Sequence, residues 1–287
     1  MKLTKLASVL ALSLGLGAMA APAYSGSNLY FFEDDNLEWV LRPDALSPTG
    51  YTEITSGNLS VGDVLYSVFE IPFFEINGVN GIPAGQELTG VAAVEVVFSS
   101  GAGAFAFKPW AGFGHGAGSM VAMWLNDLTT NVDLVGTNPS QLSCTTLAGC
   151  TAQATAGTQF QIDGFLGDPD EFWTALATTT DIGVIKGGAS STPFAVFNAG
   201  LSNIFLLGGN PVSFINPATG EECVDTTGCV QFLVSGSVLG GGGLTGTTIV
   251  GRSDFQGLKF VVPEPGTLAL LGLGLLGLSA TMRRRKA

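Results

Sequence analysis

The sequence predicts an all-β body, a β-sandwich or jelly roll with one short helix, at residues 24–261 of a 287-residue chain. Charged residues make up only 12% of the chain and 41 residues are glycine. Long periodic stretches rich in Ala, Glu, Lys, Leu and Arg are absent, which argues against a helical bundle. Segments that alternate between apolar and polar residues recur between turn-forming clusters, as in sandwich folds. No Pro/Ser-rich linker divides the body, so we expect a single domain.

The strands are predicted where alternation coincides with β-branched and aromatic residues. These segments are 63–71, 87–98, 158–166, 231–239 and 255–262. Between them lie turn signals: Asn77-Gly78, Asn80-Gly81, Gly187-Gly188 and the glycine run 240–243. Many short strands at this spacing favour a sandwich or jelly roll over a parallel sheet.

One helix is predicted in GDPDEFWTALAT, from Pro169 to about Thr178. Asp168 is suited to cap it, and Pro169 suits the first helical position. Glu171 follows the cap by three residues, as in a capping box. We expect this helix to cover one end or edge of the sandwich.

Residues 1–23 have the three-part pattern of a secretory signal peptide. Lys2 and Lys5 precede an apolar stretch, and small residues follow it. Cleavage is expected after Ala20 or Ala23, which have small residues at the −3 and −1 positions. The apolar stretch is short, and the residues that follow it are mostly small, as at a cleavage site. A retained membrane anchor is therefore disfavoured.

Residues 262–287 predict a short membrane span followed by a basic tail. The segment 266–282 is uncharged and holds seven leucines. As a helix it would measure about 25 Å, slightly less than the hydrocarbon core of a bilayer. Arg283, Arg284 and Arg285 follow at once, and such a cluster stays on the cytoplasmic side. A buried core helix is excluded, because no globular core accommodates adjacent cations at its end.

The order Pro263-Glu264-Pro265, leucine–glycine span and terminal arginines resembles the PEP-CTERM sorting signal. The resemblance implies that the chain is a substrate of an exosortase, a membrane enzyme of Gram-negative bacteria that produce extracellular polysaccharide. It implies removal of the tail near Pro-Glu-Pro and release or surface attachment of the body. The two prolines hold the backbone extended just outside the membrane, where a membrane enzyme can reach it. The resemblance covers about 25 residues and leaves the body unassigned.

The body is strongly acidic. Six of the 11 basic residues lie in the two ends, which leaves five basic and 22 acidic residues between 24 and 262, a net charge of −17. Such a body repels nucleic acid and anionic lipid. The charge indicates solubility outside the cell, or in a sharper interpretation an affinity for divalent cations.

The four cysteines form two C-x₅-C units, Cys144 with Cys150 and Cys223 with Cys229. In an exported protein they predict disulfides, with three connectivities open. Local pairing is the simplest, because the glycine before each second cysteine lets the short loop fold back. A structural zinc site is the competing interpretation, although zinc ligands are usually closer in sequence.

Catalytic patterns are absent. The single histidine, His115, lies in a glycine-rich loop. The sequence contains no G-x-S-x-G motif whose serine the histidine could activate as a general base, so no catalytic residue is assigned. Nucleotide-binding glycine motifs are also missing. The chain is therefore expected not to be an enzyme, and no cofactor is required.

Two acidic clusters contain oxygen ligands suitable for calcium. One is Glu33-Asp34-Asp35 with Glu38, and the other holds the candidate ligands Asp163, Asp168 and Asp170. Neither matches a calcium-loop motif. Paired carboxylates would also suit a glycosidase, but the residue order selects no pair.

The leading hypothesis is an exported surface or extracellular-matrix protein with a structural or interaction role. Its expected partners are the Sec export machinery, an exosortase, the inner membrane before processing, and extracellular polysaccharide. The alternatives are a carbohydrate- or calcium-binding module and a secreted hydrolase.

Overall fold

The structure is a computed structural model that describes residues 28–47, 49–127, 144–207, 212–223 and 228–261. Residues Asn28–Val261 form one unit. Its strands and helices, in chain order, are β1 (Asn28–Pro43), β2 (Tyr51–Ile54), β3 (Val64–Ile76), β4 (Val79–Asn80), β5 (Gln86–Ser99), β6 (Ala104–Pro109), β7 (Ser119–Asp127), α2 (Leu147–Ala154), β8 (Thr158–Gly164), β9 (Phe172–Ala177), α3 (Ile182–Gly187), β10 (Pro193–Leu206), β11 (Phe232–Gly240) and β12 (Gly251–Val261).

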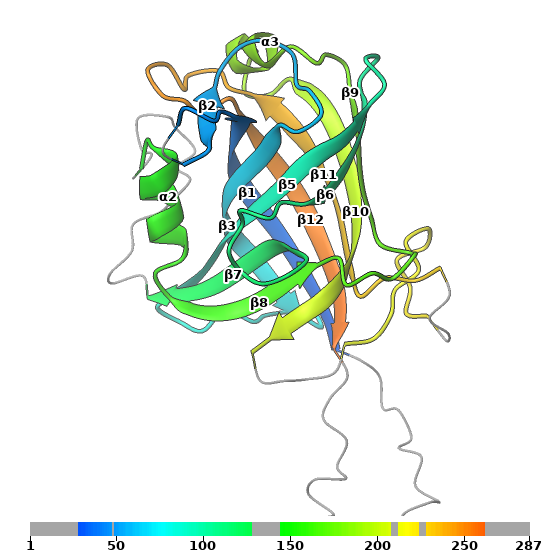
Figure 1. The fold of residues 1–287 in the computed structure, drawn as a ribbon. Helices are drawn as coiled ribbons and strands as arrows, with labels where there is room; N and C mark the ends of the chain where they lie inside the picture. The colour runs from blue at the N-terminus through cyan, green and yellow to red at the C-terminus, as the bar shows by residue number, and fades with distance from the viewer. Residues whose placement is uncertain (1–27, 48, 128–143, 208–211, 224–227, 262–287) are drawn as a thin grey trace, which may run out of the picture. The chain divides into compact units, whose positions relative to one another are not determined.

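The all-β class is confirmed, but the arrangement differs from a sandwich. One antiparallel sheet contains all the strands in the order β4-β3-β1-β12-β11-β10-β8-β7-β5-β6-β9, with β2 paired to β1. Because β3 also pairs with β5, the sheet closes on itself (Figure 1). The expectation of two stacked sheets was wrong.

Two long strands of the closed sheet change neighbour along their length. The first half of β5 pairs with β7 and its second half with β6. Likewise, β10 pairs with β9 at its start and with β8 at its end. Two routes therefore connect β10 to β5, one through β8 and β7 and the other through β9 and β6. Bulges near these changes bend the strands.

The sheet has an apolar core on each side of β1. Side chains such as Phe32 point inward, into a large aromatic and aliphatic cluster enclosed by the sheet. Alternate side chains such as Leu37 and Trp39 point outward, into a second cluster that includes Cys150 and Ala154 of α2. Successive side chains of a strand point to opposite faces of the sheet, so β1 contributes alternate residues to the interior cluster and to the outer cluster.

The predicted helix at Pro169–Thr178 is wrong. Phe172–Ala177 forms β9, whose Trp173 and Ala175 pack against the interior core while Leu176 is exposed. Glu171 accepts hydrogen bonds from the amides of Leu166 and Gly167 rather than from that of Asp168, so it does not form the predicted capping box. The chain then continues as a strand because both β6 and β10 offer it backbone pairing.

Two helices not predicted from the sequence lie at other places. Helix α2 follows Cys144 and packs outside β3, β5 and β7, and α3 lies over one end of the closed sheet (Figure 1). Thr146 caps α2 by accepting from the amide of Gly149, and Asp181 caps α3 by accepting from that of Gly183. Both are short, and their burial against the sheet stabilises them more than propensity does.

The Asn77-Gly78 turn is confirmed. Both residues have positive φ, 52° and 80°, and they join β3 to β4 as a two-residue hairpin loop. Asn–Gly is the preferred pair for such a loop, because both central residues must adopt left-handed backbone angles.

The predicted signal peptide, residues 1–23, and the predicted sorting helix lie outside the described residues. Within the ranges that are described, no helix is long and apolar enough to cross a membrane.

Candidate functional site

A polar corner lies inside the closed sheet, on three neighbouring strands. The register places Asn36 of β1 opposite Ser253 of β12, and Glu38 of β1 opposite Ser67 of β3. All four side chains point to the same interior side, because paired residues share a face and Asn36 and Glu38 are two apart.

The corner is connected by hydrogen bonds around Glu38. The Ser67 hydroxyl donates to both carboxylate oxygens, each at 2.6 Å, and the Ser253 hydroxyl donates to Oε1 at 2.5 Å. The Asn36 amide nitrogen donates to Ser253 Oγ at 2.7 Å. Burial raises the pKa of Glu38 above its usual value of 4.5, against the opposing effect of the two hydroxyl donors.

A cavity of about 100 Å³ adjoins this corner. Its remaining wall is mostly apolar, formed by strand residues such as Ala92, Val94 and Phe197, and at one end by Ile182 and Ile185 of α3. The Asn36 amide oxygen has no hydrogen-bond partner although the residue is only 2% exposed. A buried acceptor left unpaired costs about 1–3 kcal/mol, and the folded body bears this cost at Asn36.

Replacing Glu38 by glutamine is expected to change how stability depends on pH. The raised pKa means that the folded state holds a proton that the unfolded state releases above pH 4.5. Wild-type stability therefore falls as pH rises from 4.5 through the folded pKa, by up to about 1.4 kcal/mol per pH unit, and Glu38→Gln lacks this fall. Urea unfolding between pH 4 and 8 measures the difference. Parallel curves for the two proteins would contradict it; Glu33→Gln, at an exposed position of the same strand, is the control.

A second buried polar group lies further along the interior. Lys259 of β12 and Asp163 of β8 are both fully buried and form an ion pair. Gln161 and Asn203 also donate to the Asp163 carboxylate, and the Lys259 ammonium lies 5.0 Å from the Phe232 ring centre. Burial lowers the pKa of Lys259, and the charge of Asp163 opposes that shift. Three donors from the protein, Lys259, Gln161 and Asn203, thus surround the Asp163 carboxylate.

The three calcium candidates are engaged in separate contacts. Asp163 is in the buried ion pair, Asp168 accepts from the amide of Asp170, and Asp170 accepts from the amide of Gly228. Across the described ranges, no three His, Cys, Asp or Glu side chains gather as a metal site. Calcium binding stays a prediction without a site among these residues.

His115 packs between two aromatic rings on the outer side of the sheet. Its ring centre lies 4.6 Å from that of Phe113 and 5.1 Å from that of Trp124. Burial lowers its pKa. These contacts give the histidine a packing role.

The outer face of β10, β11 and β12 carries an open groove of about 370 Å³. The register aligns Asn198, Ser235 and Gln256 in one row and Val196, Ser237 and Asp254 in the next. These hydroxyl, amide and carboxylate groups are the kinds that hydrogen-bond neutral polar ligands.

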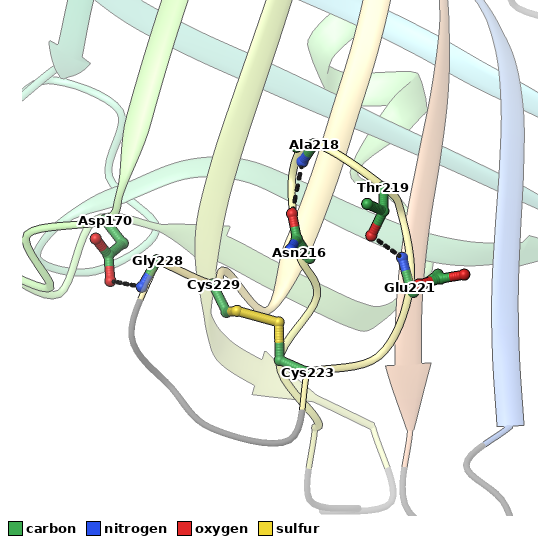
Figure 2. Close-up of a disulfide and its surroundings, with 8 residues drawn as sticks. All are labelled: Asp170, Asn216, Ala218, Thr219, Glu221, Cys223, Gly228 and Cys229. Carbon is green, nitrogen blue, oxygen red and sulfur yellow. Dashed lines mark hydrogen bonds between the residues drawn. A yellow bond between two sulfur atoms is a disulfide. The ribbon is translucent and has the colours of Figure 1, made fainter.

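Both cysteine pairs are joined locally, as the sequence favours. Cys144–Cys150 connects the segment before α2 to its first turn, and both residues are buried in the outer core. Cys223–Cys229 closes a loop before β11 (Figure 2). Asp170 accepts from the amide of Gly228 in that loop at 2.7 Å, which ties it to the turn before β9. By chain entropy each bridge contributes about 2–3 kcal/mol.

The polar corner and the Lys259 pair were missed by sequence reasoning, although a signal exists. The sequence interpretation groups Glu38 with Glu33-Asp34-Asp35 as an acidic cluster with oxygen ligands suited to calcium. Alternation puts Asn36 and Glu38 on the same face as Phe32, and Lys259 on the same face as Phe255. When a polar or charged residue occupies a strand position whose neighbours on the same face are apolar, its side chain is expected to be buried.

The described body is an all-β unit with two disulfides, consistent with a protein that functions outside the cytoplasm. A family model described as the PEP-CTERM protein-sorting motif matches residues 261–286. The chain therefore carries the sorting motif of exported proteins that exosortases process. The motif residues, including Pro263, Glu264 and Pro265, lie outside the described residues.

No curated protein matches the chain in sequence. A solved structure from structural studies of acetoacetate decarboxylase matches over 85% of this chain and 91% of that one, at 10% identity and a TM-score of 0.22. A likeness this low carries no argument on fold or activity.

Proposed function

We propose that the chain is an exported, non-enzymatic surface or matrix protein whose body acts after the signal peptide and the sorting tail are removed. The observation that supports this most is where the body ends. Val261 is both the last residue of β12 and the first residue of the sorting match, and it pairs with Asn28, the first residue of β1. Removal of the two predicted targeting segments would cut no strand.

The body suits an interaction role outside the cell. Its closed sheet leaves few unpaired strand edges, which limits unspecific pairing with other chains. Of the five basic residues of the body, Arg42, Lys108 and Lys259 form ion pairs with acidic residues, so the remaining surface charge is negative. A negative, disulfide-bonded body is suited to remain soluble and folded in an oxidising environment.

The groove on β10–β12 is the surface that we propose contacts extracellular polysaccharide. Its rows of hydroxyl and amide groups favour neutral sugars over anionic ones, because Asp254 and the net charge repel anions. The expected result is binding of the exported protein to neutral polysaccharide from the producing cells. The double substitution Asn198→Ala/Gln256→Ala should weaken it about tenfold or more, whereas Gln86→Ala, exposed on β5 away from β10–β12, should not. Equal binding by both variants would place the contact elsewhere.

Sorting is tested on the full chain in the producing cells. The triple substitution of Pro263, Glu264 and Pro265 by alanine should leave the protein in the inner membrane with its tail attached. Thr267→Ala, in the same match but outside the motif, should be processed like the wild type. Cell fractionation and intact mass distinguish the two. Normal processing of the triple variant would overturn the assignment of the motif.

A further inference from the structure

The outer face of the closed sheet is covered on one side and bare on another. The outer cluster takes its buried strand residues from β1, β3, β5, β7 and β8, and α2 packs over three of these strands. Helix α2 lies on the opposite side of the closed sheet from β9 and β10 (Figure 1). On β9 and β10 the outward side chains Thr174, Leu176, Val196 and Asn198 are exposed.

The two rows of the groove on β10–β12 continue across β9 and β6 to the end of β5. Paired residues of neighbouring strands share a face, and so do residues two apart on one strand. The outward residues that extend the rows are Thr174, Ala106 and Phe98 after Asn198, and Leu176 and Ala104 after Val196.

Beyond the groove, the exposed side chains are mostly apolar. Leu176 is 65% exposed, Phe98 52% and Val196 49%. Val196 lines the groove and also pairs with Leu176, so the polar and the apolar parts form one continuous surface. Contiguous exposed apolar side chains indicate an interaction site more strongly than scattered ones do.

A neutral glycan chain matches both parts of this surface. A sugar ring has hydroxyl groups around its edge and C–H groups on its faces, so it needs hydrogen-bonding groups and an apolar support side by side. Asn198 and Gln256 can donate to and accept from hydroxyl groups. Leu176 and Phe98 can cover the C–H faces and remove them from water.

Charge disfavours the other candidate partners of the apolar part. A second copy of the chain would bring together two bodies that each carry a large negative charge, and they would repel one another. Anionic lipid is repelled for the same reason. Within the two rows, Asp254 is the only charged residue, so the surface itself suits an uncharged partner.

The length of the surface determines which ligands reach both parts. Neighbouring strands lie about 4.8 Å apart, so the groove on β10–β12 measures about 10 Å and the whole surface from β12 to β5 about 24 Å. A disaccharide can occupy the groove, but only a longer chain laid across the strands also contacts Leu176 and Phe98.

We propose that the surface binds several consecutive sugars of a neutral polysaccharide, which runs across the strands from β12 to β5. Hydroxyl groups of the chain bind in the groove, and apolar ring faces pack on Leu176, Ala104 and Phe98. This inference rests on the proposed function of the groove. It adds the apolar part of the site, the direction of the chain and its minimum length.

The test uses two-sugar and six-sugar fragments of the neutral polysaccharide from the producing cells, titrated into the purified exported protein. Calorimetry should show that the six-sugar fragment binds about tenfold or more tighter than the two-sugar fragment. Phe98→Ser/Leu176→Ser should reduce this preference to about twofold and leave the affinity for the two-sugar fragment unchanged. Leu46→Ser/Val79→Ser is the matched control, because it also replaces two exposed apolar residues but outside the two rows.

The outcomes distinguish this inference from the function on which it rests. If neither fragment binds, or if Asn198→Ala/Gln256→Ala binds both like the wild type, the groove is not the site and both proposals fail. If the groove variant loses binding while Phe98→Ser/Leu176→Ser keeps the full preference for the longer fragment, the groove stands and the apolar extension is wrong. Equal affinity of the wild type for the two fragments would also overturn the extension.

Discussion

Replacing Lys259 by methionine is expected to lower the free energy of unfolding by about 3–5 kcal/mol, because it leaves Asp163 charged and without its cation in the protein interior. Gln161 and Asn203 would still donate to the carboxylate, but neither supplies a positive charge. Denaturant unfolding of the exported protein measures the effect. Lys108→Met is the matched control, since its ion pair with Glu95 is partly exposed and should contribute about 1 kcal/mol or less.

A double substitution separates the cost of an unpaired charge from the value of the pair. Asp163→Asn/Lys259→Met removes both charges and keeps an amide at position 163. Asn203 can still donate to that amide, and the free amide oxygen of Gln161 can accept from it. Replacing a buried ion pair by neutral groups is often neutral, so the double variant should recover most of the lost stability. A Lys259→Met protein as stable as the wild type would contradict the buried pair.

Replacing Phe32 by alanine is the second substitution with a large expected effect, about 3–5 kcal/mol, as for large aromatic side chains in cores. Phe32 is fully buried, with ring centres 4.8 Å from Phe74 and 5.8 Å from Phe232. Its neighbour Phe31 points outward and meets the part-exposed Phe73 at 6.1 Å. Phe31→Ala should therefore cost about 1 kcal/mol or less.

The pair Phe31 and Phe32 tests the register of β1 directly. A shift of one residue would exchange their faces. Thermal or urea unfolding of the two variants should show the large difference stated above. Equal losses, or a larger loss for Phe31→Ala, would show that the inward face has been assigned incorrectly.

The sequence predicted those features that depend on local chemistry. Alternation located β3, β5, β8, β11 and β12 to within a few residues. The Asn77-Gly78 turn and the local cysteine pairs depend on two to seven consecutive residues, and the structure contains them.

Features that depend on distant pairing were not predictable in the same way. Strands such as β7 are buried on both faces, so their apolar runs show no alternation. Nothing local in β5 or β10 indicates that each strand changes neighbour midway. Nothing local in β1 or β12 indicates that the first and last strands pair within one closed sheet. Asp168 and Pro169 are residue types that favour the start of a helix. Backbone pairing with β6 and β10 nevertheless makes Phe172–Ala177 a strand.

The same limit applies to the site. Asn36 and Ser253 are separated by 217 positions, and only the pairing of β1 with β12 brings them together. The sorting motif is different, because its whole signal is contiguous, and it was identified from the residues that the family model matches.

We propose above all that the closed body is the mature, exported product. The intact mass of the native protein from producing cells tests it most directly. The expected species begins after Ala20 or Ala23, ends near Pro263-Glu264-Pro265, and has all four cysteines oxidised. A species that keeps Arg283–Arg285 and has free thiols would contradict it.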